Sequence, residues 1–406
     1  SSCPVRAATP AAKAEVRELS LEECLKMATE TNESIKLAQV SLGQAKIGFQ
    51  EAKSQDRKLR KAEDEIDLTK EQIGSMPLPP EQKDQIQQAL YEGQRMLASF
   101  DVKLFKEMGL WATEEQYKLA KQGYELAQTG VRLKVTQAYH DLLKAERDIA
   151  LAEAASKAAT EYARITDVQV GLGLATESQR IAAQKALADS AAARQGAAAM
   201  YEAKKTALLK EIGLDFNTKI KLDTPAIIDE QFDFDSLLKT VMDKNINIRA
   251  AKLQAEVSGR KFSLISSWYP SITYDYQRAE MEKEESKTKL SDTERSVENS
   301  VRSSYNLYLA AKEQLPAAGE AVREAEENLR VAELKLQVGM AAQIEVLQAR
   351  QKLAQTQSNL TDVQKNYALA TASLKAAEEG LVLLTGQGSE EKSAMVGAQP
   401  TGGVHN

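Results

Sequence analysis

The stretch "VGLGLATESQRIAAQKAL", residues 170–187, places two glycines between two long runs of helix-forming residues. A dinucleotide-binding loop would need G-x-G-x-x-G after a buried strand, so that backbone amides can approach the pyrophosphate. Thr176 stands where the third glycine is required, and the preceding "SKAATEYARITDVQ" is typical of a helix. The stretch therefore indicates the turn of a helical hairpin rather than a phosphate site.

The turn belongs to a repeated sequence. A first alignment places residues 131–187 on residues 297–353 without a gap. A second alignment places "LSLEECLKMATETNESIKLAQ" (19–39) on "FDFDSLLKTVMDKNINIRAAK" (232–252). The matched pairs include Tyr139 with Tyr305, Gly173 with Gly339, Leu187 with Leu353, Tyr201 with Tyr367, and Asn32 with Asn245. The chain is thus a tandem duplication whose first copy carries 47 extra residues between the two blocks.

Each copy carries an apolar stripe with alternating three- and four-residue spacing. The stripe of the second copy is Val301, Ser304, Tyr308, Ala311, Leu315, Ala318, Val322, Ala325, Leu329, Ala332 and Leu336. That of the first copy is Val135, Ala138, Leu142, Ala145, Ile149, Ala152, Ser156, Ala159, Ala163, Thr166 and Val170. After the second turn, steps of seven join Val346, Leu353, Leu360, Tyr367, Leu374 and Leu381. This rhythm predicts an all-α chain of long helical hairpins that pack knobs-into-holes and oligomerise to bury their stripes.

The repeat limits predict four parts of the chain. Residues 1–18 form a flexible N-terminal segment, and residues 19–225 form repeat 1 with a helical insertion at about 55–110. Residues 226–386 form repeat 2, and residues 387–406 form a disordered C-terminal tail. Residues 296–338 would span about 64 Å as a helix, with a bend at Pro316 and a tight reversal at Gly339.

The composition argues against several function classes. The net charge of −6 offers no basic face for nucleic acid. The only histidines, His140 and His405, are too few and too far apart for a metal site, and no nucleophile motif is present. We therefore expect no enzyme activity, no metal and no cofactor. No apolar run approaches the roughly 18 residues that a transmembrane helix needs, and an exported protein would have lost its signal segment.

The two cysteines have different surroundings. Cys24 shares a helical face with Leu21, Leu25 and Ala28, which favours a small core residue. Cys3 follows two serines, as does the lipidated cysteine of some lipoproteins, but the upstream half of that signal lies outside the sequence. Cys3 is therefore a possible lipidation site, and an ordinary unmodified cysteine is the alternative.

The order of these elements resembles the TolC family of outer-membrane efflux and type I secretion proteins. The resemblance rests on "AYHDLLKAERDIALAE" with "VGLGLATESQRIAAQ", and on their counterparts "SYNLYLAAKEQL" and "VGMAAQIEVLQARQKL", and covers about residues 19–386. It implies a homotrimer in the bacterial cell envelope, periplasmic or outer-membrane associated, whose hairpins form a hollow α-barrel. The hairpin tips of such proteins meet a periplasmic adaptor (membrane fusion) protein and an inner-membrane ABC or proton-driven pump.

The resemblance also assigns roles to residues near the two turns. It implies adaptor-contact tips at Gly171, Gly173, Leu174, Ala175, Thr176, Gly339, Met340, Ala341 and Ala342. Glu345 matches an acidic residue that the family places at the pore constriction, whereas repeat 1 has Gln179 there. A solvated charge on the outer face is the alternative for Glu345.

The end of the chain remote from the tips departs from the family, which places two membrane strands in each copy. Residues 55–95 read as a charged helix, a turn at Pro77, Pro79 and Pro80, and another helix. "FDVKLF" (100–105) fits either a short strand or a helical face, and "SITYDYQ" (271–277) offers only brief alternation. We therefore expect little or no β-barrel. Trp111 and Trp268, about 90–105 Å from the tips along helices, mark a possible membrane-proximal end, with core packing as the alternative.

Together these observations favour a TolC-like trimeric conduit that acts in efflux or type I secretion. The alternative is a non-conducting coiled-coil spacer of the envelope, which would need neither adaptor nor pump.

Overall fold

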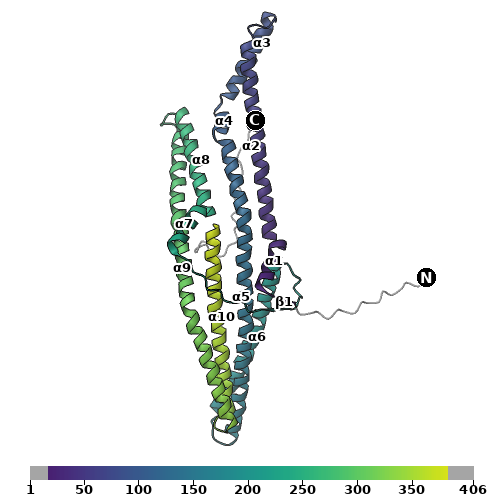
Figure 1. Ribbon diagram of the computed structural model, residues 1–406, viewed down its shortest axis with the longest axis vertical. Helices are drawn as coiled ribbons and strands as arrows, with labels where there is room; N and C mark the ends of the chain where they lie inside the picture. Colours follow the sequence, from purple (N-terminus) through teal and green to yellow (C-terminus); the bar gives the residue numbers. More distant parts are fainter. Residues whose placement is uncertain (1–16, 383–406) are drawn as a thin grey trace, which may run out of the picture.

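The computed structural model describes residues 17–382, and Figure 1 shows them as a strongly elongated bundle of helices. Cys3, His405, the predicted C-terminal tail and nearly all of the predicted N-terminal segment lie outside the described residues. Possible lipidation at Cys3 therefore remains a prediction.

The two halves of the chain share an order of elements, to which the first half adds α3, α4 and a π-helical turn. The first half contains β1 (Arg17–Leu19), α1 (Leu21–Thr31), α2 (Glu33–Gln72), α3 (Pro80–Leu97), α4 (Phe100–Leu104), a π-helical turn (Phe105–Gly109), α5 (Leu110–Gly171) and α6 (Glu177–Ile212). The second half contains β2 (Ile220–Leu222), α7 (Phe234–Lys244), α8 (Ile246–Trp268), α9 (Tyr274–Gln337) and α10 (Gln343–Glu379). Within residues 17–382 the only sheet is the parallel pair β1–β2, with Leu19 opposite Leu222. The prediction of an all-α fold is confirmed.

The long helices follow the predicted stripes. Every residue of the three stripes is buried or half-buried. Helix α9 is longer than the stripe predicted, because it begins at Tyr274 rather than near residue 296. It also continues through Pro316, where the ring removes one backbone N–H donor but does not end the helix. The ambiguous stretch 100–104 is helix α4, and residues 274–277 form the first turn of α9.

Equivalent hydrogen bonds show that the two copies also match in space. The hydroxyl of Tyr139 donates to the carbonyl of Leu19 (3.1 Å), and that of Tyr305 donates to the carbonyl of Phe232 (3.3 Å). The first alignment pairs the two tyrosines, and the second pairs Leu19 with Phe232. Both alignments therefore describe one spatial relationship between the copies.

Two equivalent asparagines connect helix starts to helix ends. Asn32 caps α2 through Ser34 N, and its amide donates to the carbonyl of Glu211 at the end of α6. Asn245 caps α8 through two backbone amides, and its amide donates to the carbonyl of Gly380 after α10 (3.3 Å). Because a helix leaves its first N–H and last C=O groups without partners, each asparagine satisfies both kinds of group at once.

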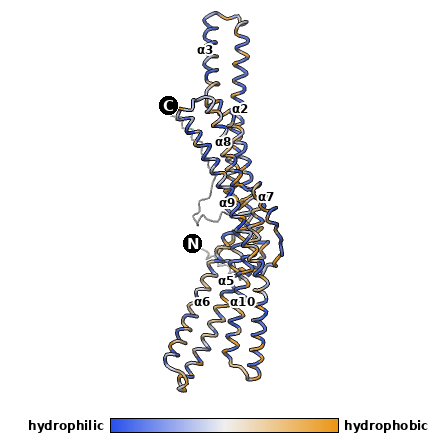
Figure 2. The backbone as a smooth tube through the Cα atoms, turned by 90° about the vertical axis from the view of Figure 1, so that its left-hand side faces the viewer, coloured by the Kyte–Doolittle hydropathy of each residue, from blue (hydrophilic) through white to orange (hydrophobic). Residues whose placement is uncertain are grey.

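In the lower half of Figure 1 the helices lie in the order α6, α5, α10, α9. Helix α5 packs against α6 and α10, and α9 packs against α10. Figure 2 shows that the α5–α6 and α9–α10 hairpins both turn at the same end of the molecule. In the upper half, α2 lies along α5 and α8 lies along α9. The arrangement is a curved layer of hairpins with α6 and α9 at its two edges.

Charged side chains join the two hairpins along α5 and α10. The carboxylate of Asp141 on α5 pairs with Lys204 of α6 (2.9 Å) and Lys365 of α10 (3.3 Å). One turn further along α5, Lys144 lies 3.8 Å from Asp362 of α10. Two turns along, Asp148 accepts a hydrogen bond from Ser358 of α10 (2.7 Å). These contacts fix the register of the two repeats.

The extra residues of the first copy extend the opposite end. Helices α2 and α3 form a hairpin beyond the top of α8 and α9, and its turn contains Pro77 and Pro79 (Figure 1). The predicted order of a charged helix, a proline turn and a second helix is confirmed. Among residues 17–382, no helix has the length and apolar character that crossing a membrane requires.

The middle of the molecule holds the core of the first repeat. Cys24 and Ala28 are fully buried there against α5 and the end of α6, which confirms Cys24 as a core residue. Burial raises the pKa of its thiol to about 11, so the thiol stays protonated at neutral pH.

His140 on α5 makes folding stability depend on pH. It is 6% exposed, and burial lowers its pKa from 6.5 to about 4, because the charged imidazolium loses its hydration. As the pH falls from 6.5 toward 4, the unfolded chain binds a proton that the folded chain does not. The free energy of unfolding should therefore fall by about 2 kcal/mol from this group between pH 7 and pH 5.

Urea unfolding of wild type and His140→Gln at both pH values measures this contribution. The variant should lose less stability on acidification than wild type, because glutamine does not titrate. Equal losses in the two proteins would show that His140 has an ordinary pKa in the fold.

Candidate partner-binding site at the helical tips

The two hairpins reverse direction with the same backbone geometry. Gly173 has φ +73° and Gly339 has φ +74°, a left-handed conformation that favours glycine. In the first turn Leu174 N donates to Gln169 O (2.8 Å), and in the second Met340 N donates to Lys335 O (2.7 Å). These bonds form a Schellman turn. In such a turn a left-handed glycine ends the helix, and the backbone N–H of the next residue bonds to a carbonyl of the last helical turn. Gly171 is the last residue of helix α5, so the reversal depends on Gly173.

The helices that leave the turns begin with related but unequal caps. Thr176 caps α6: its hydroxyl accepts from Gln179 N (3.3 Å), and Gln179 Oε1 accepts from Thr176 N (2.7 Å). In the second tip Glu345 Oε1 accepts from Ala342 N (3.0 Å), but alanine has no oxygen for the reciprocal bond. Gln179 and Glu345 thus hold equivalent places, and the Glu345 carboxylate also benefits from the positive end of the α10 dipole.

Both tips present apolar side chains to solvent. Leu174 is 76% exposed and Met340 is 77% exposed, one residue after each glycine. Leu172 and Val338, one residue before the glycines, are each 69% exposed. Ala175 and Ala341 are half-buried beside them. Each tip is thus a small convex apolar surface with no side chain of residues 17–382 covering it.

Sequence reasoning missed two members of this surface, Leu172 and Val338. The first alignment pairs them, and both are apolar where a polar residue would suffice to end a helix. Most loops are polar, so an apolar residue at the same place in both turns was the signal that could have identified them.

The chain has relatives of known family and fold. Residues 271–378 match the family model described as outer membrane efflux protein. The match covers α9, the second tip and nearly all of α10, so this part of the second repeat is similar to an outer membrane efflux protein.

Solved structures have the same fold along most of the chain. The Campylobacter jejuni CmeC outer membrane channel superposes with a TM-score of 0.62 at 13% identity, covering 90% of this chain and 86% of that one. The outer membrane protein VceC from Vibrio cholerae superposes with a TM-score of 0.59 at 15% identity, covering 89% of this chain and 96% of that one. The expected TolC-like helical fold is confirmed, and both repeats take part in it. No curated protein matches by sequence.

Both tryptophans lie at the end of the helices opposite the two tips. Helix α5 is continuous from Trp111 to Gly171, a length of about 90 Å. Trp111 stacks beneath the guanidinium of Arg260, 3.9 Å from the ring centroid. Trp268 is 41% exposed at the end of α8, with its ring 5.6 Å from that of Phe100. A membrane-proximal role for either tryptophan remains a prediction.

Within the part of the chain that the structure describes, no group of three or more histidine, cysteine or carboxylate side chains is arranged to hold a metal ion. The tips bring together backbone turns and exposed apolar side chains, an arrangement suited to protein contact.

The turn geometry predicts opposite effects for neighbouring glycines. Replacing Gly173 by alanine forces a side chain into the left-handed region and should cost about 1 kcal/mol, although no atom lies within 4 Å of the added Cβ. Gly171→Ala is the matched control: it lies in helix α5 with equally open space and should stabilise by up to about 1 kcal/mol. Thermal unfolding of both variants measures the difference. Equal effects would contradict the assignment of the reversal to Gly173.

Proposed function

We propose that this chain is the protomer of a trimeric helical conduit in the bacterial cell envelope, acting in efflux or type I secretion. In this proposal its tips dock a periplasmic adaptor protein that is coupled to an inner-membrane ABC or proton-driven pump. The observation that carries the proposal is the open layer of hairpins, whose edges are unpartnered in a single chain.

The exposed surface supports assembly. One chain exposes 26,734 Å², whereas a compact 44.6 kDa monomer exposes about 15,600 Å². Residues outside 17–382 would add at most roughly 6,400 Å² if fully extended. The remaining excess of several thousand Å² comes from helices packed on too few sides. Assembly would bury much of it.

The two edges favour a closed ring. Between residues 184 and 207 of α6 no residue is buried, and this run is rich in alanine with Met200 56% exposed. The other edge, α9, exposes Leu307 (64%). Because the edges differ, contact between them is head-to-tail, and such contacts between copies generate a ring when the rotation closes. The family resemblance gives three as the number of protomers.

The tips support the docking step. Their apolar residues would lose contact with water when a partner covers them, and the turns need no rearrangement to present them. We assign Gly171, Gly173, Leu174, Ala175 and Thr176 of the first tip, and Gly339, Met340, Ala341 and Ala342 of the second, to this contact. Leu172 and Val338 extend it.

The same proposal places Gln179 and Glu345 near the pore constriction. Both side chains are exposed although each accepts a hydrogen bond from its helix start. A trimer would carry three carboxylates at the level of Glu345 and three neutral amides at the level of Gln179. Only the second repeat would then contribute negative charge to the constriction, and this charge would favour the passage of cations.

Assembly is tested by sedimentation equilibrium. We expect wild type to sediment at three times the protomer mass at micromolar concentration. Met200→Asp should weaken the trimer, because it places a charge in the α6 edge. Tyr91→Asp is the control, since Tyr91 is 67% exposed on α3 at the remote hairpin. A wild-type monomer, or equal dissociation of both variants, would overturn the trimer.

Docking is tested by export in a deletion strain of the source bacterium. Plasmid-borne wild type should lower accumulation of ethidium, and the double variant Leu174→Asp, Met340→Asp should not, because it buries two charges in the docked tip. The double variant should remain trimeric and helical. Retained efflux by this tip variant would contradict docking at the tips.

The control for the tip variant is Tyr91→Asp with Met96→Asp, which changes two residues of similar exposure on α3. It should restore efflux like wild type. If wild type forms trimers but changes the export of neither dyes nor secreted proteins, the non-conducting spacer is favoured.

A further inference from the structure

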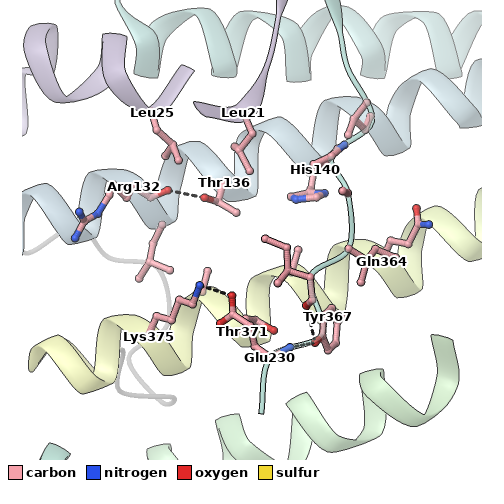
Figure 3. A pocket seen from close by; sticks show the side chains of 18 of the residues that line it. Leu21, Leu25, Arg132, Thr136, His140, Glu230, Gln364, Tyr367, Thr371 and Lys375 are labelled. Carbon is pink, nitrogen blue, oxygen red and sulfur yellow. Dashed lines mark hydrogen bonds and ion pairs between the residues drawn. The ribbon is translucent and has the colours of Figure 1, made fainter. Parts of the chain in front are cut away.

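A cavity lies between α5 and α10, away from the tips and from the edges of the hairpin layer. Its volume is about 480 Å³, within the range of about 300–1,000 Å³ that holds small molecules in other proteins. Its walls come from α1, α5, α10 and the segment 224–230 that links the repeats (Figure 3). Because α6 and α9 form the edges, ring assembly at those edges would leave this cavity within each protomer.

One buried polar group of the described residues faces the cavity without a partner. Thr371 is 8% exposed, and its Oγ1 has no hydrogen-bond partner within residues 17–382. Thr136 and Thr361, which also line the cavity, instead donate to carbonyls of their own helices. An unpaired buried hydroxyl is unfavourable, because it loses its hydrogen bonds to water and gains none within the protein. The orientation of Thr371 is therefore explained if something in the cavity bonds to it.

His140 is a second polar residue of the lining. It is 6% exposed and lines the cavity from α5. Figure 3 shows its ring directed into the space between α5 and α10. Burial lowers its pKa to about 4, so the neutral ring offers one N–H donor and one nitrogen acceptor.

The rest of the lining is mainly apolar. Leu21 and Leu25 of α1, Leu133 and Leu143 of α5, and Ile227 of the linking segment contribute hydrocarbon surface. An ordered water needs two to four polar partners, which this lining offers at only a few points. The surface therefore suits an apolar body with a hydrogen-bonding group part-way along it.

The charges of the cavity favour an anion. Arg132 pairs with Glu379 (2.7 Å), and Lys375 pairs with Glu230. Arg147 also lines the cavity but forms no ion pair with the described residues. It lies seven residues after His140, about 10.5 Å further along the same face of α5. One positive charge thus remains at one end of the cavity.

We infer that this cavity binds an anionic amphiphile: a carboxylate on an elongated apolar body that carries a hydroxyl or carbonyl group further along it. Arg147, exposed at one end of the cavity, binds the carboxylate. The Asp141–Lys365 and Asp148–Ser358 contacts place Thr371 on the far side of His140 from Arg147, and Thr371 bonds to the second polar group while His140 lies between the two. The apolar body lies against Leu21, Leu25 and Leu143. The ligand would connect α5 to α10 and thereby the two repeats.

Calorimetric titration of the delipidated protein with 12-hydroxystearate tests the inference. We expect saturable binding of one ligand per chain. Stearate, which lacks the hydroxyl, should bind about three- to tenfold more weakly. The methyl ester of 12-hydroxystearate, which lacks the charge, should bind at least tenfold more weakly. Equal affinity of acid and ester would overturn the inference, because it would indicate non-specific partition.

Variants locate the site. Arg147→Gln should weaken 12-hydroxystearate about tenfold, and Arg95→Gln on α3, an exposed arginine of the remote hairpin, is the matched control that should leave binding unchanged. Thr371→Val, nearly isosteric, should weaken 12-hydroxystearate to the affinity of stearate and leave stearate itself unchanged. Unchanged binding in both Arg147→Gln and Thr371→Val would place the ligand elsewhere.

These measurements use the purified chain without adaptor or pump. Loss of export in the tip variant and loss of binding in the cavity variants are therefore independent results. Failure of either leaves the other proposal standing.

Discussion

The contact between α5 and α10 is the constraint on which the rest of the structure depends. Each repeat contributes one long hairpin, and a hairpin alone leaves half of its apolar stripe in water. The stripes are buried because α5 and α10 lie side by side, and Asp141 binds lysines from α6 and α10 at the centre of this contact. Small stripe residues such as Ala145 let the helices approach. The register set here determines where both tips end.

Duplication explains why the tips are alike and also where they differ. The glycine turns have nearly identical φ angles and use equivalent hydrogen bonds, so the backbone of the tip is encoded twice. The caps are not equivalent, because Thr176 forms two reciprocal bonds with Gln179 and Ala342 forms only one with Glu345. One repeat therefore presents a neutral amide where the other presents a charge. A ring of such chains would alternate the two around its axis.

The cavity beside His140 arises from the same contact. The space between α5 and α10 is lined on one side by residues 224–228 and 230 of the linking segment. A tightly packed interior would have filled it with side chains, as protein cores normally are. Its unpaired threonine and neutral histidine lie where the two repeats meet. A ligand there would act on the relation between the hairpins rather than on either hairpin alone.

Sequence alone determined the repeats, the long helices, the glycine of the second turn and the burial of Cys24, because helical periodicity and left-handed glycine turns are local properties. The structure decided that Gly173, rather than Gly171, makes the first reversal. Fold class and family resemblance followed from the same residues. The apolar exposure of Leu172 and Val338 was missed, since one apolar residue beside a turn is equally consistent with core, and only their pairing in the first alignment distinguishes them.

Only tertiary structure decided the pairing of α5 with α10, the helical state of residues 100–104 and the true start of α9. These depend on contacts between segments that lie far apart in the sequence, such as Arg132 with Glu379. The cavity likewise exists only once both repeats are in place: His140 comes from the first repeat and Thr371 from the second, and each alone resembles an ordinary core residue. No local pattern carries that information, because packing between distant helices is set by the shapes of both partners.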